Sequence, residues 1–296
     1  MREITPQLTE DLKRHFHDAV ARSDAYPVSG FNDLMRKVAE LSYLNRDNLL
    51  FFRGQAEDFR NKAGASSLYP SIYRRNVLVK GRLEYEFVLL KELSALLVEE
   101  TRKVDRKSAD EIRRRQYIQW SLLQHYGVHE TPLLDITQSL SVACSFAQSR
   151  PEPAEVFVYV LGLPYLPNGI SINSEQEIVN IRLLSACPAL AMRPYFQEGF
   201  LVGTPDLTDN YDDKNELDFN RRLVAKFRIP NSSGFWKGGP QRVPEELLFP
   251  GDDEDPMLRI CSSLREAALK LEGMLFASGG SDATDELAVR LRRRLG

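Results

Sequence analysis

Cysteine is scarce in this sequence, and its scarcity argues against a fold held together by disulfides. The 296 residues include three cysteines, an odd number, at the widely spaced positions Cys144, Cys187 and Cys261. Disulfide frameworks are usually dense and even in number, so we expect free thiols in a reducing compartment. The four histidines do not combine with the cysteines in a zinc-ligand spacing, and we expect no metal site.

Long hydrophobic runs and a strong net charge are also missing. No apolar stretch approaches the roughly 20 residues that a membrane-spanning helix needs, and the N-terminus lacks the apolar segment of a signal peptide. The formal net charge of −3 gives no global argument for binding to nucleic acid or to an anionic membrane. Two short arginine runs, 113–115 and 292–294, have acidic neighbours and are typical of solvated helix faces. These absences predict a cytoplasmic protein that does not bind membranes.

The remaining composition is that of a globular protein. With 43% hydrophobic and 27% charged residues, the chain can bury a substantial core. Apolar residues that recur at steps of three and four predict amphipathic helices, and Gly127 marks the end of one of them. The expected helices occupy part of 1–25, then 32–44, 82–100, 109–126, 140–148, a stretch from Pro256 onward, and 282–295.

Continuous or alternating apolar segments between these helices predict strands. The expected strands are 49–52, 133–137, 156–161, 200–202 and 222–229. In the last of these, apolar residues alternate with Arg222, Lys226 and Arg228, which are expected on the opposite face. Together, the elements predict an α+β fold with a twisted central mixed sheet surrounded by helices.

Polar residues on the inner faces or at the ends of buried elements are the candidates for function. Arg53 ends a buried apolar run, and His125 falls on the apolar face of its helix. Asp135 and Thr137 share the inner face of a short strand, where an unpaired carboxylate costs several kcal/mol. We therefore expect Asp135 to pair with Arg53 or His125, and all four side chains to converge in one pocket. Two interpretations stay open, a pair that only braces the core and a site that performs chemistry.

Several motifs follow one another along the chain. They are Phe52-Arg53-Gly54-Gln55, Leu68-x-Pro70-Ser71-x-x-Arg74, Glu84, Gln124-His125-Tyr126-Gly127, Thr131-Pro132-Leu133-Leu134-Asp135-x-Thr137, Ala143-x-x-Phe146-Ala147, Gln197-x-Gly199-Phe200 and Leu248-Phe249-Pro250. In this order they resemble the FRG domain family, named for its Phe-Arg-Gly motif. The link from Gly127 to Thr131 is one residue longer than in the family pattern, which affects the local loop and not the membership.

This resemblance implies a domain organisation. An FRG domain is expected over 28–255, between an N-terminal helical extension at 1–27 and a C-terminal helical extension at 256–296. The function of the family is mostly unknown, but its members resemble prokaryotic and phage-associated modules, some of them linked to defence systems. The resemblance therefore implies a bacterial protein with a role in phage defence.

A second resemblance is to the ADP-ribosyltransferase superfamily. It rests on a strand that ends in Phe-Arg-Gly, a later strand that ends in Thr137-Gln-Ser139, and a following helix with the pattern Val-Ala-x-x-Phe-Ala. The resemblance implies NAD as substrate, gripped at a phosphate or a ribose by Arg53 together with Gly54 and Gln55. An arginine fork suits a phosphate, and a glycine lets the ligand approach the backbone closely.

The same resemblance assigns the remaining roles. Thr137 and Ser139 orient the nicotinamide or its ribose. A carboxylate just before the strand 200–202 holds a ribose hydroxyl and stabilises the oxocarbenium-like state of glycosidic cleavage. Gln197 and Glu198 occupy this third position, and a glutamine is a poor substitute for a carboxylate.

The sequence therefore predicts an NAD-dependent ADP-ribosyltransferase or NAD glycohydrolase, with a protein or nucleic acid as acceptor. The alternative is a non-catalytic module that binds a nucleotide or a protein. A carboxylate of Glu198 or Glu84 facing the arginine and the threonine favours the enzyme. A cluster closed by Asp135, with no open cleft, favours the binding module.

Overall fold

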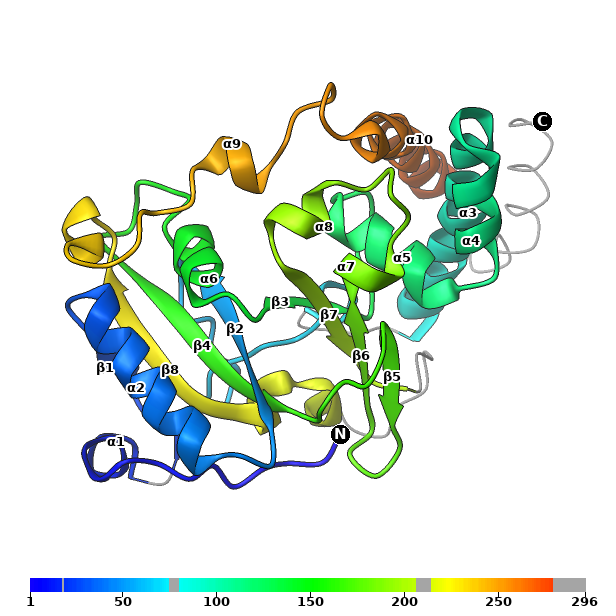
Figure 1. Ribbon diagram of the computed structural model, residues 1–296. Helices are drawn as coiled ribbons and strands as arrows, with labels where there is room; N and C mark the ends of the chain where they lie inside the picture. The colour runs from blue at the N-terminus through cyan, green and yellow to red at the C-terminus, as the bar shows by residue number, and fades with distance from the viewer. Residues whose placement is uncertain (18, 75–79, 206–213, 279–296) are drawn as a thin grey trace.

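One eight-stranded sheet runs through the computed structural model in the order β1-β8-β4-β2-β3-β7-β6-β5 (Figure 1). The structure describes residues 1–17, 19–74, 80–205 and 214–278. The strands are β1 Tyr26–Pro27, β2 Leu49–Gln55, β3 Leu134–Thr137, β4 Glu155–Leu163, β5 Ile170–Asn173, β6 Ile178–Arg182, β7 Gly199–Gly203 and β8 Leu223–Pro230. Strands β1 and β8 pair in parallel and the other neighbours pair antiparallel, so the predicted mixed α+β sheet is confirmed.

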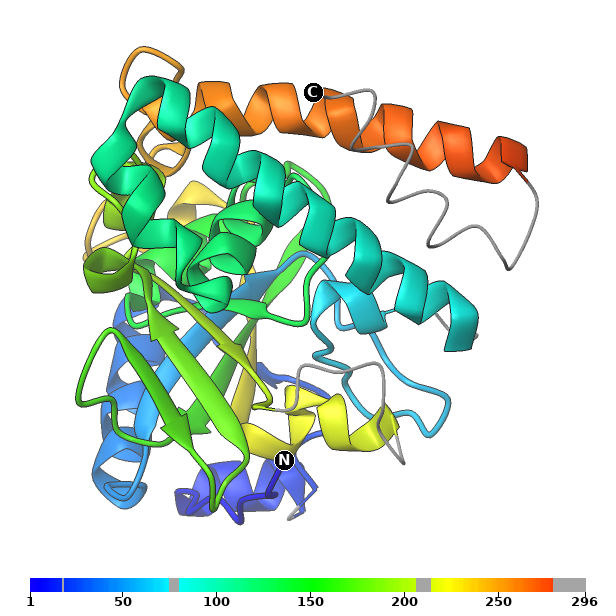
Figure 2. The same cartoon turned by 90° about the vertical axis from the view of Figure 1, so that its right-hand side faces the viewer.

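Helices cover this sheet, and the two longest lie side by side at one end of the molecule (Figure 2). They are α3 Lys80–Val104 and α10 Pro256–Ser278. The others are α1 Glu10–Phe16, α2 Phe31–Leu44, α4 Arg106–Arg113, α5 Gln116–His125, α6 Leu140–Ala147, α7 Leu183–Ala186, α8 Arg193–Phe196 and α9 Glu245–Leu248. Within the described ranges, no helix is both long enough and apolar enough to cross a bilayer. The predicted helix at 282–295 and the arginine run 292–294 lie outside the described residues.

The predicted single helix over 109–126 is wrong, because the structure divides it into α4 and α5. Arg115 has φ −130° and ψ 84°, which is not helical, and it caps the start of α5. The side-chain amide of Gln119 donates to the main-chain carbonyls of Ile112 and Arg113 at 2.9 and 3.1 Å. These bonds satisfy carbonyls that the end of a helix leaves without partners. The apolar spacing continues across this break, so the pattern alone could not show it.

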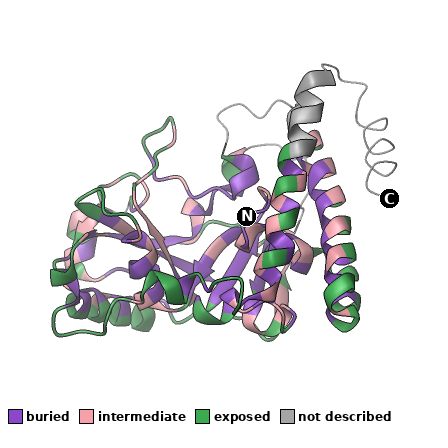
Figure 3. Cartoon of the chain, turned by 90° about the horizontal axis from the view of Figure 1, so that it is seen from above, coloured by how far each residue is buried: buried purple, intermediate pink, exposed green. Residues whose placement is uncertain are grey.

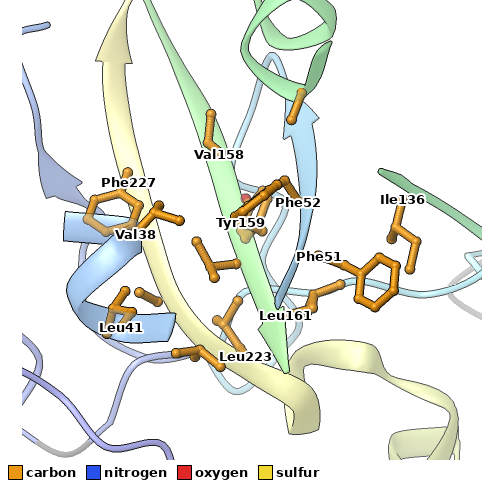
Figure 4. Packing of buried hydrophobic residues seen from close by; sticks show 14 of the residues in the cluster. Val38, Leu41, Phe51, Phe52, Ile136, Val158, Tyr159, Leu161, Leu223 and Phe227 are labelled. Atoms are coloured by element: carbon orange, nitrogen blue, oxygen red, sulfur yellow. The ribbon is translucent and has the colours of Figure 1, made fainter. Parts of the chain in front are cut away.

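Two large apolar clusters fill the space between the sheet and the helices. In the first, Val38 and Leu41 of α2 pack with Leu223 and Phe227 of β8 (Figure 4). The N-terminal segment joins this cluster through Leu8, Leu12, Phe16 and Val20, so residues 1–27 pack on the same core as the sheet. The second cluster joins α3, α4, α5 and α10 to β6 and β7. Helices α3 and α10 bury one side and expose the other (Figure 3).

Two of the three cations expected on the second face of the strand 222–229 are buried. Arg222 directly precedes β8 and Lys226 lies within it, and neither has any exposed surface, whereas Arg228 is half-buried. Arg222 Nε donates to the carbonyl of Gly162 at 2.8 Å, and Lys226 Nζ lies 3.3 Å from the carboxylate of Asp58. Burial lowers the pKa of both cations, and for Arg222 the pKa falls to about 10. These two buried cations are therefore held by a paired charge and by hydrogen bonds.

The sheet is split between β2 and β3. Strand β2 pairs with β4 along its full length, and β3 pairs with β7 along its full length. Between β2 and β3, in contrast, the ladder consists of the single pair Phe52–Thr137. The split divides the sheet into the half β1-β8-β4-β2 and the half β3-β7-β6-β5.

Candidate functional site

A cavity of about 270 Å³ opens beside the Phe52–Thr137 pair, where the two half-sheets separate. It combines an apolar wall with a group of polar side chains. Its lining consists of Phe52, Arg53, Gly54, Gln124, His125, Asp135, Ile136, Thr137, Ala143, Phe146, Gln197, Gly199, Phe200 and Phe249. The structure therefore brings the four predicted residues, Arg53, His125, Asp135 and Thr137, to one cavity.

Arg53 crosses the split with its side chain. Its Nη1 donates to the main-chain carbonyl of Asp135 at 2.6 Å, and its buried Nε has no hydrogen-bond partner among the described residues. Burial, partly opposed by the charge of Asp135 and assisted by that of Arg74, lowers the pKa of the guanidinium to about 10. The guanidinium stays charged at neutral pH, and most of its five N–H donors make no hydrogen bond with the described residues.

The carboxylate of Asp135 faces the cavity and is bound by a different residue. Gln124 Nε2 donates to Asp135 Oδ2 at 2.8 Å, and the side chain of Asp135 keeps 37% of its surface exposed. Burial raises the pKa of Asp135, but His125, Arg53 and Gln124 together outweigh it and the net shift is downward. The carboxylate is therefore ionised at neutral pH. The direct bond from Arg53 goes to the main chain, so of the two expected partners it is His125 that faces the carboxylate.

His125 lies at the end of α5 with 5% of its side chain exposed, as its place on the apolar face predicts. Its Nδ1 is 3.6 Å from Asp135 Oδ1, and its Nε2 has no hydrogen-bond partner in the described chain. The side chain of His125 thus lines the cavity with one nitrogen beside a carboxylate and the other buried without a partner among the described residues, and an imidazole in this setting is a candidate to accept or donate a proton. No group of three or more His, Cys, Asp or Glu that could hold a metal occurs among the described residues.

Thr137 and Gln197 are held by bonds within the protein. Thr137 Oγ1 lies 3.1 Å from the carbonyl oxygens of Gln197 and Glu198 and accepts from Ser139 N at 3.0 Å. Gln197 Nε2 donates to the carbonyl of Leu248 at 2.6 Å. These contacts tie the end of β3 to the start of β7 and to α9. Both side chains therefore have a structural role in the cavity wall, because these groups already bond within the protein.

Glu198 does not enter the cavity. Its side chain is exposed, and its backbone has φ 44°, in the left-handed region that non-glycine residues seldom adopt. Glu84, the other candidate carboxylate, is exposed on α3 and does not line the cavity. Ser139 precedes α6 and lies outside the lining, and Gln55 lines a different cavity described below. Asp135 is the carboxylate that the described residues place in the cavity.

Gly54 lines the cavity and also lets a helix pack closely on its strand. A β-carbon at this position would lie 1.9 Å from the carbonyl oxygen of Ala143 and 2.7 Å from the amide nitrogen of Ala147. Both neighbours are backbone atoms of α6, so no side-chain movement can relieve the clash. The absence of a side chain at Gly54, and the small side chains facing it, let α6 lie directly on β2.

Several residues around the site had no role in the sequence prediction. Phe146, Phe249 and Tyr126 belong to the quoted motifs, whereas Arg193 and Asp255 carry no distinct signal in the sequence. Phe146 and Phe249 form an edge-to-face pair on the cavity wall, with ring centroids 5.6 Å apart. Arg193 lies over the Phe249 ring at 5.3 Å and donates to the carbonyl of His125 at 3.2 Å. The buried Asp255 accepts from the hydroxyl of Tyr126 and from the main-chain nitrogen of Arg193. This chain of contacts fixes the end of α5, where His125 lies.

Comparison with known families gave one match. Residues 48–155 match the FRG domain family, and this range contains the motifs from Phe52 to Ala147. No curated protein and no solved structure matches the chain.

The matched range contains ten of the fourteen described lining residues, from Phe52 to Phe146, including Arg53, His125 and Asp135. The remaining lining residues, Gln197, Gly199, Phe200 and Phe249, come from β7 and α9 and their neighbourhood, beyond the matched range. The cavity is therefore completed by a part of the chain that the FRG match does not cover, although the same sheet contains both parts.

Proposed function

We propose that the Arg53 cavity binds NAD and that the protein is an ADP-ribosyltransferase or an NAD glycohydrolase. The observation that carries the proposal is the state of Arg53. Its guanidinium is charged, stands in a cavity, and makes one hydrogen bond, to a main-chain oxygen. A desolvated arginine with free donors is a phosphate-binding group, because its fork can hold two oxygens at once.

The order of the strands supports an ADP-ribosyltransferase-like arrangement as part of this proposal. Strands β2, β3 and β7 are consecutive in the sheet. Arg53 belongs to β2, Thr137 ends β3, and Gln197 and Glu198 directly precede β7. The three positions named by the resemblance are therefore neighbours in space. An effector role in phage defence belongs to the same proposal, supported by the family resemblance.

The reaction assigns a role to each polar side chain of the cavity. Breaking the bond between the ribose C1′ and the nicotinamide nitrogen leaves the electron pair on neutral nicotinamide and an oxocarbenium-like ribose. The ionised Asp135 stabilises that positive charge. Water, or the hydroxyl of an acceptor, then attacks C1′ and loses its proton to Nε2 of His125, which Asp135 orients through Nδ1. Asp135 takes the part that the resemblance gives to the third carboxylate.

A non-catalytic nucleotide-binding module is the second candidate. It is favoured by the internal bonds of Thr137 and Gln197, which occupy the groups that the transferase resemblance assigns to substrate. Both candidates require Arg53 for binding, and only the enzyme consumes NAD. Binding and turnover must therefore be measured separately.

The test combines calorimetric NAD binding with an NAD-consumption assay, in the presence and absence of cell extract as acceptor. Arg53→Ala should weaken NAD binding by roughly tenfold to a hundredfold, because a charged hydrogen bond contributes about 1.5–3 kcal/mol. Arg53→Lys should recover little, since an ammonium cannot hold two phosphate oxygens in a fork. Arg114→Ala is the matched control, because Arg114 is exposed and lies outside the cavity.

A melting curve for each variant separates a folding defect from a loss of binding. Wild-type protein that binds NAD without consuming it would support the binding module. Wild-type protein that neither binds nor consumes NAD contradicts the proposal in both forms.

A further inference from the structure

A second and larger cavity, of about 630 Å³, opens beside the end of β2. It is polar and rich in cationic side chains. Its lining consists of Gln55, Phe59, Arg60, Asn61, Lys62, Ala63, Ser67, Tyr69, Arg74, Lys214 and Asn215. This volume falls within the range of about 300–1,000 Å³ that is usual for small-molecule sites, whereas the Arg53 cavity is slightly below it. The Arg53 cavity is therefore large enough for one end of a dinucleotide and not for the whole molecule.

The charged side chains among the described lining residues are all cationic. Among the described lining residues there are four cationic side chains and no carboxylate. Arg60 is already bound to Asp58 and Asp24, at 3.0 and 2.9 Å. Arg74 uses its Nε to bind the carbonyl of Tyr69, and its terminal nitrogens have no partner in the described chain. An anion in the cavity would meet these free donors.

Lys62 is a second free cation on this lining. Its side chain is exposed and makes no hydrogen bond or ion pair with the described residues. Because nothing in the fold depends on it, Lys62 can be replaced with little effect on stability. It therefore offers a clean probe of the charge of the cavity.

Aromatic rings accompany the cations. Phe59 lines the cavity and has 55% of its surface exposed, so its ring is accessible to a ligand. The ring of Tyr69 lies 4.6 Å from Lys214 Nζ in a cation–π contact. Aromatic faces beside cationic side chains are the combination that holds a base by stacking and its phosphate by charge.

Gln55 provides an independent observation. Its Oε1 is buried without a hydrogen-bond partner among the described residues, and its amide makes no other side-chain bond there. A buried amide oxygen left unpaired costs free energy, so such groups usually have a partner in the functional state. A ligand that donates a hydrogen bond, such as the amino group of a nucleobase or a ribose hydroxyl, would supply it.

The two cavities are neighbours. Arg53 and Gln55 are two positions apart on β2 and therefore point to the same face, with Cα atoms about 7 Å apart. Arg74 is close enough to Arg53 to contribute to the downward shift in its pKa. Arg53 lines one cavity and Arg74 lines the other, so a diphosphate that joined ligands in the two cavities would pass between these two cations.

We propose that the cavity lined by Phe59, Lys62 and Arg74 is a subsite for a nucleoside monophosphate, the adenylate half of the dinucleotide. The nicotinamide riboside end then occupies the Arg53 cavity, and this second half of the inference rests on the proposed function. In this subsite the base stacks on the ring of Phe59, and the phosphate lies between Arg74 and Lys62.

Calorimetry with AMP, and separately with inorganic phosphate, tests the subsite. Wild-type protein should bind AMP, and Lys62→Glu and Arg74→Ala should each weaken that binding by roughly tenfold or more. Phe59→Ala should weaken AMP binding at least about fivefold and leave phosphate binding unchanged, because only the base stacks. Arg114 is exposed and lies outside both cavities, so Arg114→Ala should change neither AMP binding nor phosphate binding.

AMP contains no nicotinamide, so its binding does not depend on NAD cleavage. A wild-type protein that fails to bind AMP overturns the subsite. So does unchanged AMP affinity in Lys62→Glu and Arg74→Ala when their melting curves match the wild type. NAD binding that needs Arg53 but is indifferent to Lys62 and Arg74 overturns the subsite and leaves the proposed function standing.

Discussion

Arg53 and Asp135 meet through the main chain: the guanidinium donates to the carbonyl of Asp135 at 2.6 Å, and the carboxylate of the same residue binds Gln124. The positive and the negative charge of the cavity are therefore close without being joined in an ion pair. Because each charged group is held by a different hydrogen bond, a substitution can remove one charge without displacing the other group.

Asp135→Asn should abolish NAD turnover while it leaves the melting temperature nearly unchanged. An asparagine oxygen can still accept from Gln124, and the 37% exposed side chain leaves little buried charge to compensate. Asp135→Ala should cost roughly 1–3 kcal/mol, because the amide of Gln124 then loses its acceptor. Chemical denaturation beside the NAD-consumption assay measures both effects. Full turnover by a folded Asp135→Asn protein would remove this residue from the mechanism.

Gly54→Ala should destabilise the protein by about 3 kcal/mol or more, since the new β-carbon would overlap backbone atoms of α6 that cannot move alone. The matched control is Gly251→Ala, because a β-carbon at Gly251 meets no atom within 4 Å. The control should stay within about 0.5 kcal/mol of the wild type in urea denaturation. Equal stability of the two variants would show that α6 does not lie as close to β2 as described.

Asp218 should make the protein less stable as the pH rises from about 4 to about 6. Burial raises the pKa of this carboxyl to about 6, against the effect of bonds from the main-chain nitrogens of Asn220 and Leu68. A folded-state pKa above the unfolded value means that folding favours the protonated form. The contribution is complete below the unfolded pKa and is lost as the pH passes through the folded pKa.

Asp218→Asn removes this titration and keeps an oxygen acceptor for both main-chain bonds. At pH 7 the variant should therefore be more stable than the wild type by roughly 2–3 kcal/mol, the equivalent of about two pKa units. At pH 4 the difference should disappear. Thermal unfolding of both proteins across this pH range measures it, and a difference independent of pH would contradict the assignment.

The strands of the core could be predicted because their signal is local. The runs beginning at Leu49 and Val156 are apolar on both faces, as strands inside a sheet are, and the structure extends each by a few residues. The hairpin of β5 and β6 was not predicted. Its first strand has partly exposed residues on both faces, so it lacks the alternation that distinguishes a strand from a loop.

The site was predictable only in part. His125 was found because a histidine on an apolar helix face is conspicuous, whereas its neighbour Gln124 projects about 100° away from that face. In the structure the last turn of α5 lies between β3 and the segment that contains Ser71, so Gln124 also reaches the cavity. It donates to Asp135 and accepts from Ser71 and Thr131. Contacts between segments this far apart in sequence have no periodic signal.

A single residue pair, Phe52–Thr137, joins the backbones of the two half-sheets beside the cavity. Within each half, continuous ladders hold one strand against the next. Across the split, side chains take over this task, because one apolar cluster contains residues of both halves and the rings of Phe51 and Phe200 lie 5.0 Å apart. The width of the cavity is therefore set by the sizes of packed side chains and not by the fixed spacing of a hydrogen-bonded ladder.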